Sequence, residues 1–368
     1  MNIDQLAGTS MTAERAVVTR RNPTRTSAAS QRVSSTVNST SRRTSVPKRK
    51  KTMLSRVAES IYWMGRQVER AENLARFLEV THNLSLDDPF NVTNSWTPLI
   101  QVTADVEQFE TNYDVANAET VTRFIAFDET YPNSMLSSLR SARANARGVR
   151  ESLSSEVYEQ LNDFYHFVLN ASRNPIIDSP NEFFDDVRRI AIQWAGVLDN
   201  TMPRDLGWHF ANVGRLIERA DKTSRILDVK YFNLLPRIQD VGTSVDDLQW
   251  SALLLAISGF EAYRREHHLI DIEKVVEFFL LNKIFPRSIL FCVSGANDSL
   301  KQIQAFSTSG KPRQSQENTA SLVRRLEQTE VSEVLGAGMH LFIDQLQIRL
   351  NEIGESINLD YLNSKIDE

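Results

Sequence analysis

The sequence predicts an all-helical protein, a bundle without a β-sheet, and three observations support this fold class. Glycine and proline are scarce, with 13 and 11 residues among 368, so the chain has few of the turn residues that a many-stranded sheet needs. From Met53 onward apolar residues recur at intervals of three and four, which is the period of an amphipathic helix. Moreover, no segment shows sustained alternation of apolar and polar residues between turns. Hydrophobic residues make up 41% of the chain, enough for a sizeable core.

Residues 1–52 form a separate region that we expect to be disordered. They contain 11 Lys and Arg residues but only two acidic residues, and the stretch 24–44 is mostly Ser, Thr, Arg and Asn, with almost nothing to bury. We interpret the region as a flexible basic tail, or as an upstream extension before a start at Met53. A basic, acid-poor stretch can also be a transit peptide or bind nucleic acid, but Asp4 and the weak amphipathicity argue against transit.

Residues 53–368 are expected to form one helical domain, and its charge balance is acidic, with 31 basic and 45 acidic residues. Such a domain does not attract nucleic acid or anionic lipid non-specifically. No apolar run approaches the roughly 18–20 residues that a membrane span requires, and residues 1–30 contain no apolar core of a secretory signal. The single cysteine, Cys292, allows neither an intrachain disulfide nor a Cys-based zinc site. These features agree with a reducing, cytoplasmic compartment.

The helices can be placed along the chain from their apolar periodicity and from the turn residues between them. The longest run, 54–84, has Ile61, Met64 and Val68 on one face. Ser154 is a candidate N-cap, Pro286 a first-turn residue, and the polar segment 307–318 is expected to be a mobile loop. The further helices are predicted over residues 98–112, 117–127, 134–152, 154–171, 181–200, 205–230, 246–263, 271–282, 287–305, 319–330 and 331–353.

An internal repeat is the most specific feature of the sequence. Gly-Arg-Gln-Val-Glu-Arg-Ala-Glu at residues 65–72 matches Gly-Arg-Leu-Ile-Glu-Arg-Ala-Asp at 214–221 without gaps, at a constant offset of 149 residues. The similarity extends over 61–80 and 210–229, so we predict two pseudo-repeated halves that descend from one helical unit. A glycine inside a helix costs about 1 kcal/mol relative to alanine. Its recurrence at the same position of both copies indicates that another backbone or side chain approaches closely there.

Each repeated helix has an apolar face and an opposite face of alternating charge. In one interpretation both charged faces are solvated surface, with ion pairs of about 0.2–0.5 kcal/mol each. In the other, the two charged faces meet, so that Glu69-Arg70 pairs with Glu218-Arg219 and lines a shared polar cleft. The candidate binding residues are Arg66, Glu69, Arg70, Glu72, Arg143, Arg147, Arg215, Glu218, Arg219 and Asp221.

Other possible sites give weaker signals. Arg143, Arg147 and Arg150 share one helix face, which either holds carboxylates or phosphates or is a solvated basic surface. His267-His268 lacks companion ligands at metal spacing, so we expect no metal site. No Gly-rich phosphate loop is present, so we expect no cofactor, and ATP would have to bind a partner. Cys292 is expected in the core.

The motifs resemble those of the bacterial alpha-E family, which is named for a helical domain with Glu-Arg motifs. The resemblance rests on residues 53–73, on Arg-Asp-Leu-Gly-Trp-His-Phe at 204–210, and on the blocks 142–151 and 285–288. It covers the chain from Met53 to near its end. The resemblance implies a helical fold, and a role beside a circularly permuted ATP-grasp protein that is similar to peptide ligases. It also implies a transglutaminase-like cysteine peptidase as a frequent companion.

Three functional hypotheses follow. The leading one is an accessory protein of an ATP-grasp-linked system that forms peptide or amide bonds, which binds a partner or a peptide substrate through the charged cleft. The alternative is an enzyme in which Glu69 and Glu218 act as general acid and base while arginines hold a carboxylate. The third is a purely structural helical scaffold, in which substitution of the same residues would unfold the protein.

Overall fold

The computed structural model describes the chain between Met53 and Leu362, with five gaps. The described residues are 53–87, 96–103, 106–174, 179–233, 243–306 and 312–362. Within these ranges every regular element is a helix and no strand occurs, which confirms the predicted all-helical class. The predicted basic tail, residues 1–52, lies outside them. None of the helices in the described part of the chain combines the length and the apolar composition that crossing a bilayer requires.

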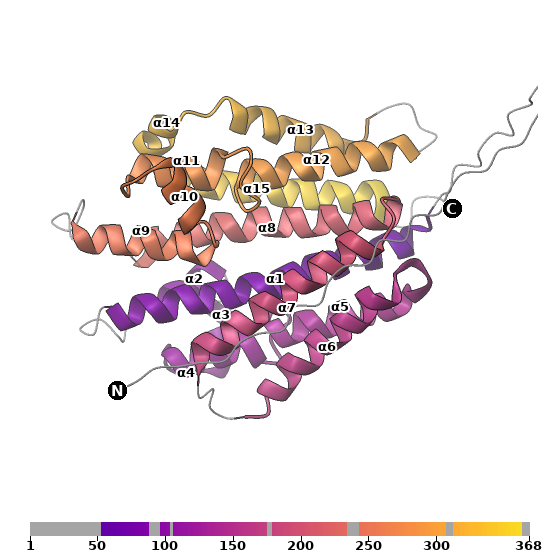
Figure 1. The fold of residues 1–368 in the computed structure, drawn as a ribbon, viewed down its shortest axis with the longest axis horizontal. Helices are drawn as coiled ribbons and strands as arrows, with labels where there is room; N and C mark the ends of the chain where they lie inside the picture. Colours follow the sequence, from indigo (N-terminus) through magenta and orange to yellow (C-terminus); the bar gives the residue numbers. More distant parts are fainter. Residues whose placement is uncertain are drawn as a thin grey trace, which may run out of the picture. The chain divides into compact units, whose positions relative to one another are not determined.

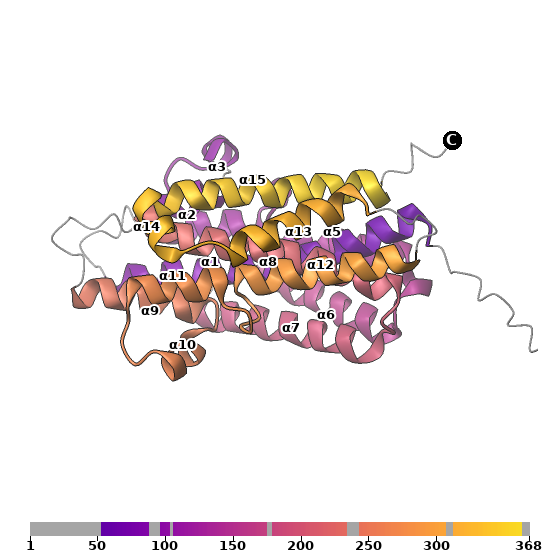
Figure 2. The same ribbon diagram turned by 90° about the horizontal axis from the view of Figure 1, so that it is seen from above.

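Two long helices, α1 (Ser55–Asp87) and α8 (Leu206–Asn233), lie side by side between the other helices (Figures 1 and 2). The apolar face of α1 is fully buried, as the periodicity of residues 54–84 predicts. Helix α8 begins next to Asp205, whose side chain accepts a hydrogen bond from the backbone N–H of Gly207 at 3.0 Å. The two helices that carry the sequence repeat therefore form the centre of the described region.

The helices that follow α1 in the chain pack around it. Both α5 (Met135–Gly148) and α7 (Pro180–Thr201) contact α1, and α6 (Ser155–Ala171) packs on α5 and α7. The hydroxyl oxygens of Ser134 and Ser154 accept hydrogen bonds from backbone N–H groups in the first turns of α5 and α6, at 3.1 and 3.3 Å. The N-cap predicted at Ser154 is thus confirmed.

The helices that follow α8 pack in the same order. Both α12 (Ile289–Phe306) and α15 (Met339–Ile357) contact α8, and α13 (Gln314–Glu327) packs on α12 and α15. In Figure 1 these orange and yellow helices lie above the α1–α8 pair, and the magenta helices α5 and α6 lie below it. The common origin of the two halves stays a prediction.

Short helices connect the long ones and cross over between the halves. Helix α2 follows α1 in the chain but packs on α8, and α9 follows α8 but packs on α1. The short elements are α2 (Thr97–Thr103), α3 (Val106–Asn112), α4 (Ala118–Thr122), a π-helical turn (Arg123–Phe127), a 3-10 turn (Arg150–Ser152), α9 (Ser244–Ala256), α10 (Phe260–Glu266), α11 (Ile272–Leu281), α14 (Val331–Ala337) and a second π-helical turn (Asn358–Leu362).

Two of the predicted helices are interrupted at a residue with a positive φ. The helix predicted over 246–263 ends at Ala256, because Ser258 has a φ of 55°, in the left-handed region where a right-handed helix cannot continue. Similarly, the helix predicted over 331–353 is divided into α14 and α15 at Gly338, whose φ is 101°. The sequence pattern spans both breaks because the apolar residues on either side keep helical spacing.

Two other expectations were wrong in part. The mobile loop predicted over 307–318 overlaps α13, which begins at Gln314, while 307–311 lie outside the described residues. Helix α12 begins at Ile289 rather than near Pro286, because the Ser288 hydroxyl accepts a hydrogen bond from the backbone N–H of Phe291 at 3.2 Å and so caps the helix.

Helices α1 and α8 approach most closely at two glycines. A Cβ atom on Gly65 would lie 2.5 Å from the carbonyl oxygen of Ala211, and one on Gly214 would clash with the carbonyl oxygen of Tyr62 in the same way. The contact is reciprocal, since Ala211 follows Tyr62 by the repeat offset of 149 residues. This geometry confirms the close approach predicted at both glycines.

Candidate functional site: the charged seam between the central helices

The charged faces of α1 and α8 meet, and their ion pairs are reciprocal. Arg70 Nε donates to Glu218 at 2.7 Å, and Arg219 donates to Glu69 through Nε at 2.8 Å and Nη2 at 2.7 Å. Glu218 and Glu69 are 0% and 3% exposed. The predicted pairing between the two Glu-Arg dipeptides is therefore confirmed, and the interpretation as solvated surface is wrong. We call this buried interface of paired side chains between α1 and α8 the charged seam.

One side of the seam is filled by the protein itself, and we call it the closed lobe. It comprises Glu69, Glu72, Asn73, Arg76, Arg219 and Arg287. Arg287 enters from the loop before α12 and donates to Asn73 Oδ1 at 3.1 Å, while its Nη2 contacts Glu72. Arg76 donates to Glu72 at 2.7 Å and to the carbonyl oxygen of Ala256 at 2.6 Å, at the end of α9. The side chains of Arg76, Arg287 and Arg219 are 1%, 8% and 12% exposed, so little of this lobe reaches solvent.

The other side, which we call the open lobe, borders a cavity. It comprises Arg66, Arg70, Asn133, Glu218, Asp221, Lys222 and Arg225. Arg66 Nε donates to Glu218 at 2.8 Å, and Lys222 Nζ lies 2.9 Å from Asp221. Arg70 Nη1 donates to Asn133 Oδ1 at 2.6 Å.

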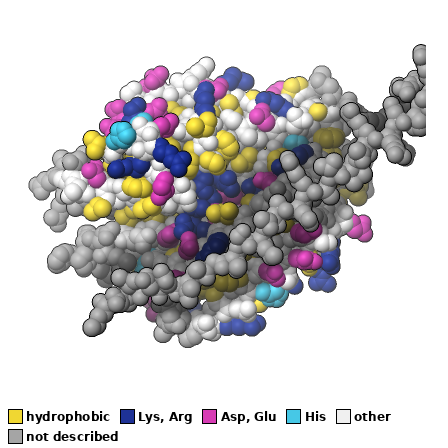
Figure 3. Space-filling view, viewed as in Figure 1, with side chains coloured by type: hydrophobic (Ala, Val, Ile, Leu, Met, Phe, Trp, Pro, Cys, Tyr) yellow, Lys and Arg dark blue, Asp and Glu magenta, His cyan; other side chains and the backbone are white. Residues whose placement is uncertain are grey.

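The cavity of the open lobe has a volume of about 230 Å³ and a basic lining. Four cations line it, together with Asp221 and with polar side chains from α2, from the loop before α5 and from α15. The side chains of these cations (Arg66, Arg70, Lys222 and Arg225) are 16–17% exposed. The face drawn in Figure 3, on the side of α7, α9 and α10, carries a further group of Lys and Arg side chains in its middle, with acidic ones among them. The four cations of the cavity belong to a chain whose net charge is negative.

The loops that precede α5 and α12 correspond to each other, and each places a different residue in its lobe. The sequence Pro-Asn-Ser precedes α5, and Pro-Arg-Ser precedes α12, 154 residues later. In both loops the serine, Ser134 or Ser288, caps the helix that follows, so the preceding residue occupies the same place relative to that helix. That residue is Asn133 at the open lobe and Arg287 at the closed lobe.

In the two lobes, one amide and one cation occupy swapped positions. Asn73 of α1 corresponds to Lys222 of α8 in the repeat. The closed lobe therefore combines a helix amide, Asn73, with a loop cation, Arg287, whereas the open lobe combines a helix cation, Lys222, with a loop amide, Asn133. The long loop arginine fills the first lobe, and the short loop asparagine leaves the second with its cavity.

The basic partners keep the carboxyl groups of the seam ionised. Burial raises the pKa of Glu218, but Arg70 and Arg66 lower it by more, to well below its usual range. The same balance of burial against neighbouring cations lowers the pKa of Glu69, and it lowers the pKa values of Glu72 and Asp221 to about 2. At neutral pH these groups are hydrogen-bond acceptors and poor proton donors.

Most of the predicted site residues lie in or beside the seam, but two do not. Arg143 Nε donates to Asn162 at 2.7 Å, and its guanidinium lies 5.1 Å from the centre of the Tyr165 ring. Arg147 is exposed. Since Ala142 and Ala146 form the buried face of α5, the neighbouring arginines point toward α6 or solvent and lie outside the seam, and a binding role for them stays a prediction. Arg215 is buried, with Asp199 at 3.7 Å.

The sequence interpretation missed six side chains of the seam. For two of them, the signal was the repeat itself, since Arg76 and Arg225 are 149 residues apart. For the loop residues Asn133 and Arg287, the signal was the Pro-x-Ser sequence that precedes two helices. The constant offset of 149 residues does not align these two sequences. The missed residues are Asn73, Arg76, Asn133, Lys222, Arg225 and Arg287.

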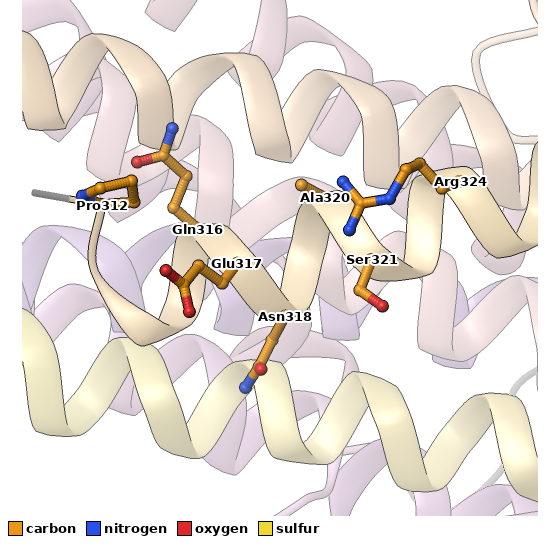
Figure 4. Close-up of a pocket in the computed structure, with 7 residues that line it drawn as sticks. All are labelled: Pro312, Gln316, Glu317, Asn318, Ala320, Ser321 and Arg324. Atoms are coloured by element: carbon orange, nitrogen blue, oxygen red, sulfur yellow. The ribbon is translucent and has the colours of Figure 1, made fainter.

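Two other features were considered as sites. A hollow of about 470 Å³ lies on α13, but its lining comes from the single segment 312–324, and the labelled side chains do not converge (Figure 4). Among the described residues, possible ligand atoms of Asp228, His340 and Asp344 lie within 4.8 Å of one another. Both ring nitrogens of His340 already face these carboxylates, at 2.9 and 3.5 Å, so we interpret the group as a hydrogen-bonded triad.

Comparison with known proteins identifies the helical region. The sequence model of the Alpha-E family, described as a predicted alpha-helical domain with a conserved ER motif, matches residues 53–362. Uncharacterised proteins of Mycobacterium bovis and Mycobacterium tuberculosis are 24% identical to the chain over 316 residues, which is 79% of this chain and 34% of each relative. The chain thus spans about a third of the length of these curated relatives. No solved structure matches it significantly.

Proposed function

This chain belongs to the Alpha-E family, and from that premise we propose that it is a binding protein whose charged seam receives a partner or a peptide. The system it serves forms peptide or amide bonds and includes an ATP-grasp-type ligase-like protein and a transglutaminase-like peptidase, as its family resemblance implies. Its proposed compartment is the cytoplasm, where the single Cys292 stays reduced.

One observation carries the proposal, namely the difference between the two lobes. Two Glu-Arg pairs hold α1 and α8 together, and the family description refers to an ER motif. Within the described residues, the open lobe borders a cavity lined by partly exposed cations, whereas Arg287 occupies the corresponding position in the closed lobe. Cations that already have carboxylate partners and still face a cavity are suited to receive a further anionic group from a ligand.

The enzyme alternative has less support. A general acid must carry a proton near neutral pH, but burial is outweighed by the arginine partners and the pKa values of Glu69 and Glu218 are lowered. Each of these carboxylates is also occupied by its guanidinium partners. The scaffold alternative accounts for the closed lobe but not for the basic cavity of the open lobe.

The architecture of the relatives agrees with an accessory role. About two thirds of the length of each mycobacterial relative lies outside the aligned region. A helical module that functions beside another domain or subunit is expected to recur as part of a longer chain, and this supports the proposal that ours binds a partner.

Co-purification tests the proposal. The full chain would be co-expressed with the ATP-grasp-type protein of the same organism and isolated through a tag on one partner. We expect Lys222→Ala and Arg66→Ala to weaken the complex about tenfold, since a hydrogen bond to a charged group contributes roughly 1.5–3 kcal/mol. Arg147→Ala, which removes an exposed arginine outside the seam, is the matched control. Equal recovery of all variants, with helical circular dichroism unchanged, would contradict the proposal.

A further inference from the structure

We propose that the open lobe binds a carboxylate, namely the C-terminal carboxylate of a peptide. This inference rests on the proposed function, because it takes the open lobe as the place where the protein meets its ligand, and it specifies the chemical group that is recognised.

Two arginines of the open lobe, Arg66 and Arg70, have more donors than their partners in the described residues occupy. A guanidinium carries five N–H bonds. Arg66 directs Nε and Nη2 to Glu218 and Nη1 to the hydroxyl of Tyr62. Arg70 directs Nε and Nη2 to Glu218 and Nη1 to Asn133. Each guanidinium therefore keeps N–H bonds beyond these contacts, and both side chains line the cavity.

Lys222 adds a third cation to the same wall. Its ammonium group has three N–H bonds. It lies 2.9 Å from Asp221 and 3.7 Å from Glu218, so within the described residues one carboxylate is in direct hydrogen-bond range. The guanidinium groups of Arg66 and Arg70 and the ammonium group of Lys222 thus border one small cavity, beside Arg225, and such charge-assisted donors recognise oxyanions.

The wall favours a carboxylate over a phosphate. Asp221 lines the cavity and Glu218 lies directly behind its arginines, so a dianion would meet two negative groups at short range. Thr103, Asn133 and Asn351 also line the cavity and can hydrogen-bond a neutral amide. The volume of about 230 Å³ lies below the 300–1,000 Å³ of ordinary ligand pockets. It suits the end of a chain rather than a nucleotide.

The closed lobe shows what an occupied lobe looks like. There, Arg287 fills the space that the shorter Asn133 leaves empty in the open lobe, and Asn73 stands in place of Lys222. Installing the residues of the closed lobe, through Asn133→Arg together with Lys222→Asn, should therefore fill the cavity. The exchange preserves the number of cations in the lobe, so it changes access more than net charge.

Binding of small probes to the full chain tests the inference. N-acetyl-dialanine with a free carboxylate would be titrated into protein labelled with ¹⁵N-arginine, and the Nε–H resonances would report contact with the lobe. Its carboxamide analogue and the α-amide of N-acetyl-glutamic acid, which carries only a side-chain carboxylate, are the comparison probes. We expect the free C-terminal carboxylate to bind at least about tenfold more tightly than the carboxamide, and more tightly than the side-chain carboxylate.

The variants complete the design. We expect the Asn133→Arg/Lys222→Asn protein to lose binding at least about tenfold and Arg147→Gln to bind as the wild type does. Should the double variant fail to fold, Lys222→Gln alone tests the same point. Equal binding of carboxylate and carboxamide, stronger binding of inorganic phosphate, or undiminished binding by the folded variants would overturn the inference. A partner complex that depends on Lys222 without any carboxylate binding would leave the proposed function standing. Carboxylate binding without a partner complex would support the site and contradict the proposed partner.

Discussion

The closed and the open lobe are built on the same pair of helices and yet differ in what they leave exposed. In both, a buried Glu of one helix holds an Arg of the other, and a second acidic residue follows three positions later. In the closed lobe a loop arginine completes the network, whereas in the open lobe a helix lysine and a loop asparagine do so. The two lobes therefore differ in which position, helix or loop, carries the amide and which carries the cation. With the cation on the loop the lobe is a filled ion-pair network, and with the amide on the loop it borders a cavity.

This difference separates stability from binding within one motif. Buried ion pairs contribute little net stability, since desolvation offsets their attraction, but removing one partner leaves a costly unpaired charge. In the closed lobe, both the acidic and the basic partners are buried enough for an unpaired charge to be costly. In the open lobe the same holds for Glu218, which is buried, but the arginines border a cavity. The lobes should therefore respond unequally to equivalent substitutions.

The largest effect is expected from Glu69→Gln. Loss of this carboxylate strands Arg219 and Arg287 in a lobe with little access to water, so the free energy of unfolding should fall by about 3–5 kcal/mol. Glu218→Gln, the equivalent change in the open lobe, should cost less, because Arg66 and Arg70 can be hydrated from the cavity. Urea denaturation followed by circular dichroism measures both values.

The exposed pair of Arg140 and Glu129 provides the control for these substitutions. Its side chains are 43% and 58% exposed, so Glu129→Gln should change the free energy of unfolding by less than about 1 kcal/mol. If Glu218→Gln lowered the free energy of unfolding as much as Glu69→Gln or more, water in the cavity would not hydrate the unpaired arginines. The proposed difference between the lobes would then be contradicted.

Acid should weaken both lobes together. The folded pKa values of Glu72 and Asp221, about 2, lie below their ordinary values of 4.5 and 3.8, because the cations beside them outweigh burial. The unfolded chain therefore binds protons first, so stability is present above pH 4.5 and is lost as the pH falls toward 2, on the order of 3 kcal/mol for Glu72. Unfolding free energies measured across this range in the wild type and in Glu72→Gln test this. A pH slope that Glu72→Gln leaves unchanged would exclude Glu72 as a source.

The core of the seam could be predicted from sequence because the repeat has no gaps. A constant offset of 149 residues placed Glu69 and Glu218 at equivalent positions, and charge complementarity then indicated that each pairs with the arginine of the other copy. The recurring Gly65 and Gly214 indicated that the two helices themselves touch, since a glycine that weakens a helix is retained where its missing Cβ is needed.

The difference between the lobes could not be predicted in the same way. Asn133 and Arg287 are loop residues, and their offset of 154 residues departs from that of the helices, so their equivalence appears only when both are seen to precede a capping serine. Arg143 and Arg147 were assigned to the site from helical spacing alone. Spacing shows which residues share a face, but not whether that face meets the site or solvent.

The glycines give a smaller, symmetric effect that sharpens the reciprocal geometry. Gly65→Ala and Gly214→Ala each place a methyl group against a backbone carbonyl of the other helix, so each should cost about 1–3 kcal/mol. Gly196→Ala in α7 is the control, because a Cβ there meets nothing within 4 Å and should stabilise the helix by up to about 1 kcal/mol. Thermal unfolding compares the three. Unequal costs at Gly65 and Gly214 would argue that the approach of α1 and α8 is not reciprocal in solution.

The smallest effect tests the exchange of amide and cation directly. Arg287→Asn gives the closed lobe the loop residue of the open lobe and leaves Glu69 and Glu72 with one cation fewer. Adding Asn73→Lys supplies the helix cation that Lys222 provides in the open lobe, and it should recover about 1 kcal/mol of the lost stability through coupling of neighbouring charges. Asn73→Met, which adds bulk without charge, should recover none. A double-mutant cycle on the free energy of unfolding isolates this coupling from the separate effects of the two substitutions. Coupling near zero would mean that a cation on the helix cannot replace one from the loop, and that the two lobes are not variants of one arrangement.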